Sequence, residues 1–188
     1  KYAEHVLKLL NLEDCKPVDV PITATRTIEE IDERHRLPDE QASLFRQCIG
    51  SARFDRQFRV DKNFAVKELS HGLAHPVEAD MQRLKKYARY LKGTMNLGTW
   101  LSKDGGLDVL KCAGDSDWAG DRKTGKSTSG GVIMRGQHLI KAWSRTQDAI
   151  TLSSAEAEFV ALGKLPVEVL GVRSRCEQWK LSKDRHGR

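Results

Sequence analysis

The sequence predicts an α/β protein, with a small, mainly helical part over residues 1–100 and a mixed sheet with at least one packed helix over residues 101–188. In the first part, apolar residues recur three or four positions apart, which is the spacing of one helical face. After residue 100, short apolar runs alternate with polar residues between glycine-containing turns, a pattern typical of strands. A last apolar run, after Ser153, returns to helical spacing.

Four segments of the first part have the helical pattern, and an acidic linker separates the first of them from the rest. The linker covers residues 25–40, which are polar and contain few apolar positions. The expected helical segments are residues 2–12, 42–54, 64–75 and 76–93.

A charged segment lies between two of these expected helices. Arg53, Asp55, Arg56 and Arg59 stand where a continuous core would need apolar side chains. Because burial of an unpaired charge is costly, we expect this segment to be exposed.

The positive charge of the chain is concentrated after residue 45. Residues 1–45 hold six Lys/Arg against ten Asp/Glu, a balance of −4, so the total of +6 leaves +10 for the remainder. Such an excess favours binding to a phosphate backbone, although a solvated basic surface gives the same pattern. On the expected helix at 76–93, Lys85, Arg89 and Lys92 are the candidate nucleic-acid contacts.

Cysteine spacing and hydropathy indicate the cellular compartment of the protein and whether it spans a membrane. The four cysteines are widely separated and form no Cys-x-x-Cys pair, which indicates reduced thiols in a cytosolic or nuclear protein. No apolar run approaches membrane-spanning length, so we expect no membrane partner.

Acidic residues gather at both ends of the stretch 115–158. A strand over residues 107–114 is expected to deliver Asp115 to its carboxyl end, and two further strands, 127–136 and 138–144, meet at a turn around Gly136. If the following helix packs across this sheet, acids from both ends of the stretch approach one metal ion, an arrangement suited to phosphodiester chemistry.

The two glutamates on the last helix have different expected roles. Ser153 and Glu156 have the spacing of a capping box, so Glu156 is read as structural. Glu158 lies about 200° further round the helix, before an apolar run, and burial there favours a cation as its partner. Asp117 and Asp121 are second choices as site acids and are interpreted as turn residues, whose side chains form hydrogen bonds to the backbone.

Several motifs in this stretch resemble the ribonuclease H domain of copia-type LTR retrotransposon Pol polyproteins. They are GDSDWAGD, KSTSGG, the altered strand IKAW and LSSAEAEFVAL. Upstream, KYAEHVLKLLNL, LFRQCIGS and AHPVEADMQRLKKYARYLKGT are similar to the segments that lead from the reverse transcriptase thumb and connection region into ribonuclease H. The resemblance covers roughly residues 1–165 and implies a ribonuclease H-like fold that is incomplete at its C-terminus.

The resemblance also implies a site. Asp115 and Glu158 correspond to family acids that hold two Mg²⁺ (or Mn²⁺) ions and cleave the RNA strand of an RNA–DNA hybrid. Ser127 and Thr128 are candidate contacts to phosphate or sugar. The implied partners are an RNA–DNA hybrid and the rest of the Pol polyprotein, in the cytoplasm (a virus-like particle) or the nucleus.

The chain departs from the family pattern after Gly163. The later family acids have no counterpart there, and Pro166 is expected to kink or end the helix. We therefore expect little or no nuclease activity from the isolated chain. The alternatives are a non-catalytic nucleic-acid binder and a decayed fragment whose exposed apolar surface promotes aggregation.

Overall fold

The computed structural model describes residues 2–22, 35–56, 59–99 and 109–179. The chain divides into two compact units, Lys1–Thr99 and Trp100–Arg188. The first unit is helical and the second is a sheet with a helix, so the mixed α/β class predicted from the sequence is confirmed.

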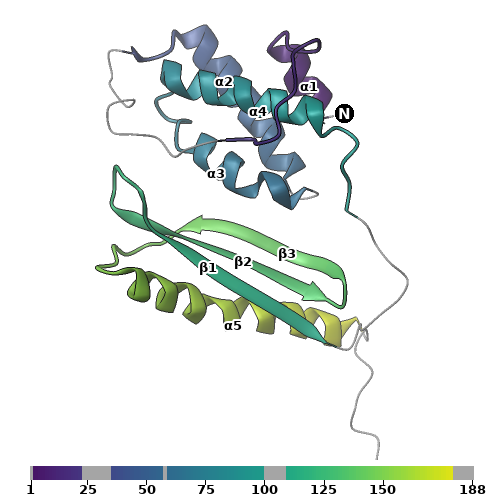
Figure 1. The fold of residues 1–188 in the computed structure, drawn as a ribbon, viewed down its shortest axis with the longest axis vertical. Helices are drawn as coiled ribbons and strands as arrows, with labels where there is room; N and C mark the ends of the chain where they lie inside the picture. Colours follow the sequence, from purple (N-terminus) through teal and green to yellow (C-terminus); the bar gives the residue numbers. More distant parts are fainter. Residues whose placement is uncertain (1, 23–34, 57–58, 100–108, 180–188) are drawn as a thin grey trace, which may run out of the picture. The chain divides into compact units, whose positions relative to one another are not determined.

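The first unit is built from four α-helices and one short 3-10 turn in its described residues (Figure 1). Most of the predicted linker lies outside the described residues, and α2 begins at its end, after Pro38. The elements are α1 (Tyr2–Leu9), α2 (Asp39–Asp55), η3 (Val60–Lys62), α3 (Asn63–Ser70) and α4 (Glu78–Gly93).

The core of this unit forms where the apolar faces of the helices meet. Phe45 and Ile49 on α2 and Leu84 and Tyr87 on α4 are fully buried. Burial raises the pKa of the nearby Cys48 thiol to about 11, so this cysteine is an inert core side chain at neutral pH.

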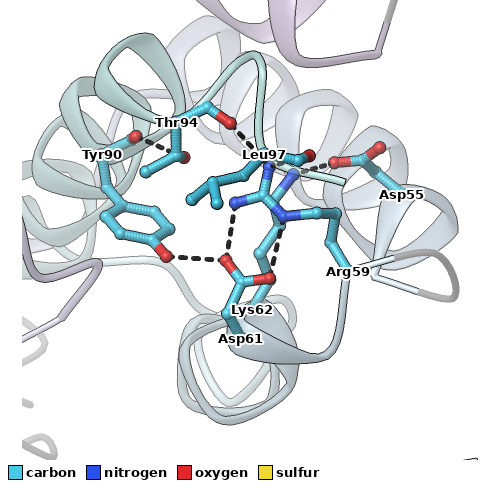
Figure 2. A network of polar contacts seen from close by, with 7 residues as sticks. All are labelled: Asp55, Arg59, Asp61, Lys62, Tyr90, Thr94 and Leu97. Carbon is cyan, nitrogen blue, oxygen red and sulfur yellow. Dashed lines mark hydrogen bonds and ion pairs between the residues drawn. The ribbon is translucent and has the colours of Figure 1, made fainter. Parts of the chain in front are cut away.

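The charged segment between α2 and α3 is held by ion pairs, and the prediction that it is simply exposed is wrong for part of it. Lys62, only 2% exposed, pairs with Asp55. Arg59 forms hydrogen bonds to both carboxylate oxygens of Asp61, and Asp61 also accepts one from the Tyr90 hydroxyl (Figure 2). Pairing makes the burial tolerable because each charge keeps a partner.

The second unit has a three-stranded antiparallel sheet in the order β1-β2-β3, with α5 along one face (Figure 1). Two basic residues of β3, Lys141 and Arg145, pair with Glu168 of α5 and tie that strand to the helix. The elements are β1 (Leu110–Asp121), β2 (Lys126–Arg135), β3 (His138–Thr146) and α5 (Ser154–Gln178).

The strand register shows which side chains face α5. Gly114, Gly131 and Trp143 lie opposite one another across the three strands. A Cβ atom added to Gly114 would collide with Leu165 of α5, so this row faces the helix. Side chains alternate along a strand, and the rows at odd distance from Gly114 therefore face away from α5.

Two sequence-based expectations about this unit are wrong. Asp115 lies inside β1, which continues to Asp121, and not at the end of a strand. α5 runs through Pro166, so the expectation that the helix ends there is wrong, whereas a kink at Pro166 stays a prediction. Both Pro166 and Leu162, whose carbonyl loses its helical partner, are exposed, so water can satisfy that carbonyl and the cost of the proline is reduced.

Candidate functional site

Glu158 lies in the second turn of α5, close to the edge of the sheet. Ser153 caps the helix, since its hydroxyl accepts a hydrogen bond from the backbone N–H of Glu156 at 3.1 Å. The carboxylate of Glu158 is half-buried and accepts the backbone N–H of Ser116 at 3.3 Å. Among the described strands, β1 lies at the edge of the sheet, and this bond gives one of its N–H groups a partner.

Asp115 points to the other side of the sheet. Asp115 is exposed and lies opposite Gly130 of β2. It stands between Gly114 and Ser116 in the regular part of the β1–β2 pairing, so its side chain points to the opposite face of the sheet from theirs. Since the Gly114 row faces α5, the Asp115 side chain faces away from it. Glu158 thus contacts Ser116, the residue next to Asp115. The carboxylates of Asp115 and Glu158 nevertheless lie on different sides of β1.

The remaining acids have structural contacts. Asp121 accepts hydrogen bonds from the backbone N–H of Lys123 and the hydroxyl of Thr124, which fixes the turn between β1 and β2. Asp117 lies against Gly120, where a Cβ would collide with its carboxylate. Glu156 accepts the N–H of Leu152 at 2.7 Å, so its role at the start of α5 is confirmed.

Ser127 and Thr128 are both buried. The Ser127 hydroxyl lies 2.8 Å from that of Thr151 and accepts the backbone N–H of Ala119. It therefore ties β2 to the end of β1 and to the segment before α5. Their predicted contact with phosphate or sugar stays a prediction, and it requires these buried groups to become accessible.

Gln147 is a site residue that the sequence analysis missed. It is 1% exposed, and its Nε2 donates to the Ser129 hydroxyl and to the Ala157 carbonyl, each at 2.9 Å. Its backbone N–H donates to the carbonyl of Ser127. A single glutamine between a strand and a helix gives no local signal of such a role, because its partners are distant in sequence.

On the helical unit, Lys85 and Lys92 are exposed on one side of α4 and lie seven residues apart. Arg89 lies between them on the same side, but its Nε donates to the carbonyl of Lys16 at 2.8 Å. These three residues form a basic stripe, which we define as Lys85, Arg89 and Lys92.

The described residues do not by themselves fit a two-ion site. Within the ranges the structure describes, no group of three or more His, Cys, Asp or Glu side chains is placed to hold a metal ion. Asp115 and Glu158 supply two carboxylates from different sides of one strand, so no catalytic step follows from this arrangement alone. Among the described helices, none has the length and apolar character needed to cross a membrane.

Comparison with known proteins gives the class of this chain. No family model matches the sequence, and no solved structure matches the chain. The uncharacterized mitochondrial protein AtMg00810 of Arabidopsis thaliana is 31% identical over 169 residues, covering 90% of this chain and 68% of that protein. The retrovirus-related Pol polyprotein from transposon RE1 of the same plant is 32% identical over 90% of this chain. The corresponding polyprotein from transposon TNT 1-94 of Nicotiana tabacum is 28% identical over 92%.

These relatives define a retrotransposon Pol-type protein. The chain belongs to the family of retrovirus-related Pol polyproteins of copia-type transposons and their mitochondrial relatives. It spans only 11% of the RE1 polyprotein and 13% of the TNT 1-94 polyprotein.

Proposed function

We propose that residues 101–188 are the N-terminal part of a ribonuclease H domain, which in its complete form hydrolyses the RNA strand of RNA–DNA hybrids. The proposal is supported by the sequence motifs, by the Pol relatives, and by the hairpin sheet with a helix that carries an acid to the edge of β1. Mg²⁺ or Mn²⁺ is the proposed cofactor, and Asp115 and Glu158 are its proposed ligands from this chain. Residues 1–100 are proposed to be the thumb and connection region of the reverse transcriptase.

The isolated chain is proposed to be inactive. The observation that carries this is the placement of Asp115 and Glu158 on different sides of β1, with no third acid beside them in the described residues. Two carboxylates in this arrangement provide too few ligands for a pair of closely spaced metal ions. Additional acids and a shift of Asp115 or Glu158 are needed to complete the site.

Incubation with a labelled RNA–DNA hybrid tests both the ribonuclease H assignment and the proposed inactivity of the isolated chain. With Mg²⁺ or Mn²⁺, the 188-residue chain is expected to release no RNA fragments, and robust cleavage that Asp115→Asn abolishes would contradict the proposed inactivity. A chimera joins Arg188 to the segment that follows the matched region in the RE1 polyprotein. It is expected to cleave the hybrid and to lose cleavage with Glu158→Gln. A folded chimera that is inert with both metal ions would contradict the ribonuclease H assignment.

A second candidate function is nucleic-acid binding without catalysis. It is favoured by the basic stripe on α4, where Lys85 and Lys92 are exposed, and by the +10 balance after residue 45. In this case, hybrid affinity falls as salt rises, because neutralised phosphates release condensed counterions. A salt titration of hybrid binding measures this, and affinity that does not change with salt excludes the function.

A further inference from the structure

Five residues of the second unit form a closed chain of contacts around Glu158. Ser116 on β1 lies opposite Ser129 on β2 in the sheet register. Gln147 Nε2 donates to the Ser129 hydroxyl and to the Ala157 carbonyl. Glu158 follows Ala157 on α5 and accepts the N–H of Ser116. We define this closed chain as the Glu158 ring.

Gln147 is the only member of the Glu158 ring that joins the helix to β2 through its side chain. Its amide nitrogen has two protons and makes two bonds of 2.9 Å, one on each side of the gap between β2 and α5. The side chain is 1% exposed, so water does not compete for these bonds. The side chain of Gln147 therefore bridges Ser129 on β2 and the Ala157 carbonyl in the first turn of α5.

Glu158 directly follows Ala157 on α5, so a movement of this turn of the helix also moves the Glu158 carboxylate. Its bond to Ser116 is 3.3 Å long, close to the limit for a hydrogen bond, so a small displacement of α5 breaks it. We propose that Gln147 is a positioning residue that holds the Glu158 carboxylate at the edge of β1 that faces away from β2. The inference rests on the proposed function only in naming Glu158 as a metal ligand, since the contacts themselves exist without a metal.

The backbone N–H of Ser116 reports the position of Glu158 directly. Its exchange with solvent deuterium, followed residue by residue by NMR, measures how often the bond to Glu158 opens. Gln147→Met keeps the length of the side chain and removes both donated bonds. The Gln147 Oε1 atom has no hydrogen-bond partner among the described residues, so the variant reports the loss of the Nε2 bonds.

Gln147→Met is expected to speed exchange at Ser116 about tenfold, the effect of losing one hydrogen bond of ordinary strength. Glu158→Ala is expected to have a similar effect. The double variant is expected to exchange no faster at Ser116 than Glu158→Ala alone, because both changes act through one contact. Thr151→Val is the matched control, since it removes a buried hydroxyl from the same segment outside the Glu158 ring and is expected to leave Ser116 unchanged.

Two results would overturn the proposal. One is exchange at Ser116 in Gln147→Met at the wild-type rate, and the other is a double variant whose effect is the product of the single effects. If Gln147→Met does not fold, Ser129→Ala removes one of the two bonds with a smaller change in volume. It is expected to speed exchange at Ser116 about threefold, and the wild-type rate would again count against the proposal.

Failure of the proposed function gives a different result. A chimera that cleaves no hybrid, combined with the expected exchange rates, removes the metal-ligand role of Glu158 but keeps the positioning role of Gln147. Cleavage by the chimera with unchanged exchange in Gln147→Met keeps the ribonuclease H assignment and removes the positioning role.

Discussion

Arg59 and Asp61 form a two-point ion pair at the junction of α2 and α3, with nitrogen–oxygen distances of 2.8 and 2.7 Å. The same guanidinium donates to the carbonyl of Thr94 at 2.7 Å, just after the end of α4 (Figure 2). Arg59 therefore joins Asp61 of η3 to Thr94, the residue that follows α4, where the carbonyl groups of a helix end need partners.

Replacing Arg59 is expected to destabilise the helical unit. Arg59→Ala removes both parts of the ion pair and the bond to Thr94, and its side chain is only 11% exposed. We expect the free energy of unfolding to fall by about 2 kcal/mol. All three tyrosines lie in the first unit and all four tryptophans in the second, so tyrosine absorbance in a urea titration follows the first unit.

Arg53→Ala is the matched control for this prediction. Arg53 is an exposed arginine on the neighbouring turn of α2, and its removal is expected to change the free energy of unfolding by less than about 0.5 kcal/mol. Equal effects of the two substitutions would show that the contacts of Arg59 contribute nothing beyond its charge.

The stability of the helical unit should also depend on pH through Asp61. Burial raises the pKa of Asp61, but the hydrogen bonds from Arg59 and Tyr90 outweigh it, and the pKa lies below its ordinary value. A carboxyl with a lowered folded pKa stabilises the fold above its unfolded pKa of about 3.9, and this stabilisation is lost as pH falls through the folded pKa.

Urea titrations between pH 6 and pH 2 measure this effect, with both limits chosen to bracket the ordinary pKa of aspartate. In Asp61→Asn the unit is expected to be less stable at pH 6 and to lose less stability on acidification. An acid dependence identical to that of the wild type would show that Asp61 is not responsible for it.

The helices of this chain could be predicted from local sequence, and the effect of Pro166 could not. Amphipathic spacing and the Ser153 cap are local signals. The ends of α4 and the start of α5 that they predict lie within two residues of the observed positions. The cost of a proline depends instead on whether the orphaned carbonyl reaches water, and the exposure of α5 at Pro166 and Leu162 depends on packing.

The roles of the site residues stay a prediction, and the geometry of those residues could not be predicted from the sequence. The motifs identify Asp115 and Glu158, but the face on which Asp115 points depends on the alignment of Gly114 with Leu165 on α5. A shift of one residue in that alignment reverses the two faces, and no single segment encodes it. For the same reason Gln147, whose partners are 10 and 18 residues away, could not be identified.

The basic stripe on α4 makes a prediction about salt dependence. Lys85→Gln and Lys92→Gln are each expected to weaken hybrid binding and to reduce the slope of log affinity against log salt by about 1. Lys8→Gln is the control, since Lys8 is exposed on α1 of the same unit but outside the stripe. Fluorescence anisotropy of a labelled hybrid at several salt concentrations measures both quantities, and equal losses in all three variants would contradict a specific role for α4.

Adjacent glycines in β2 should respond very differently to substitution. A Cβ on Gly131 would collide with the ring of Trp143 on β3, whereas a Cβ on Gly130 has no atom nearer than the Trp143 carbonyl oxygen at 3.9 Å. Gly131→Ala is expected to lower the free energy of unfolding of the second unit by about 2 kcal/mol, and Gly130→Ala to change it by less than about 0.5 kcal/mol. Tryptophan fluorescence in a urea titration compares them, and similar midpoints would contradict this packing of Trp143.

The outer side of α5 carries an apolar stripe that nothing in the described part of the second unit covers. Phe159 and Leu170 are 77% and 61% exposed, and Leu162 and Val167 between them are also exposed. Contiguous apolar surface of this kind binds hydrophobic dyes. The dye ANS is therefore expected to fluoresce with the folded chain, and the double substitution Phe159→Gln and Leu170→Gln is expected to reduce the signal at least twofold. Val109→Gln and Ile140→Gln are the control, since these exposed residues lie outside α5. If the control pair reduces the signal as much as the α5 pair does, the dye does not bind at the stripe.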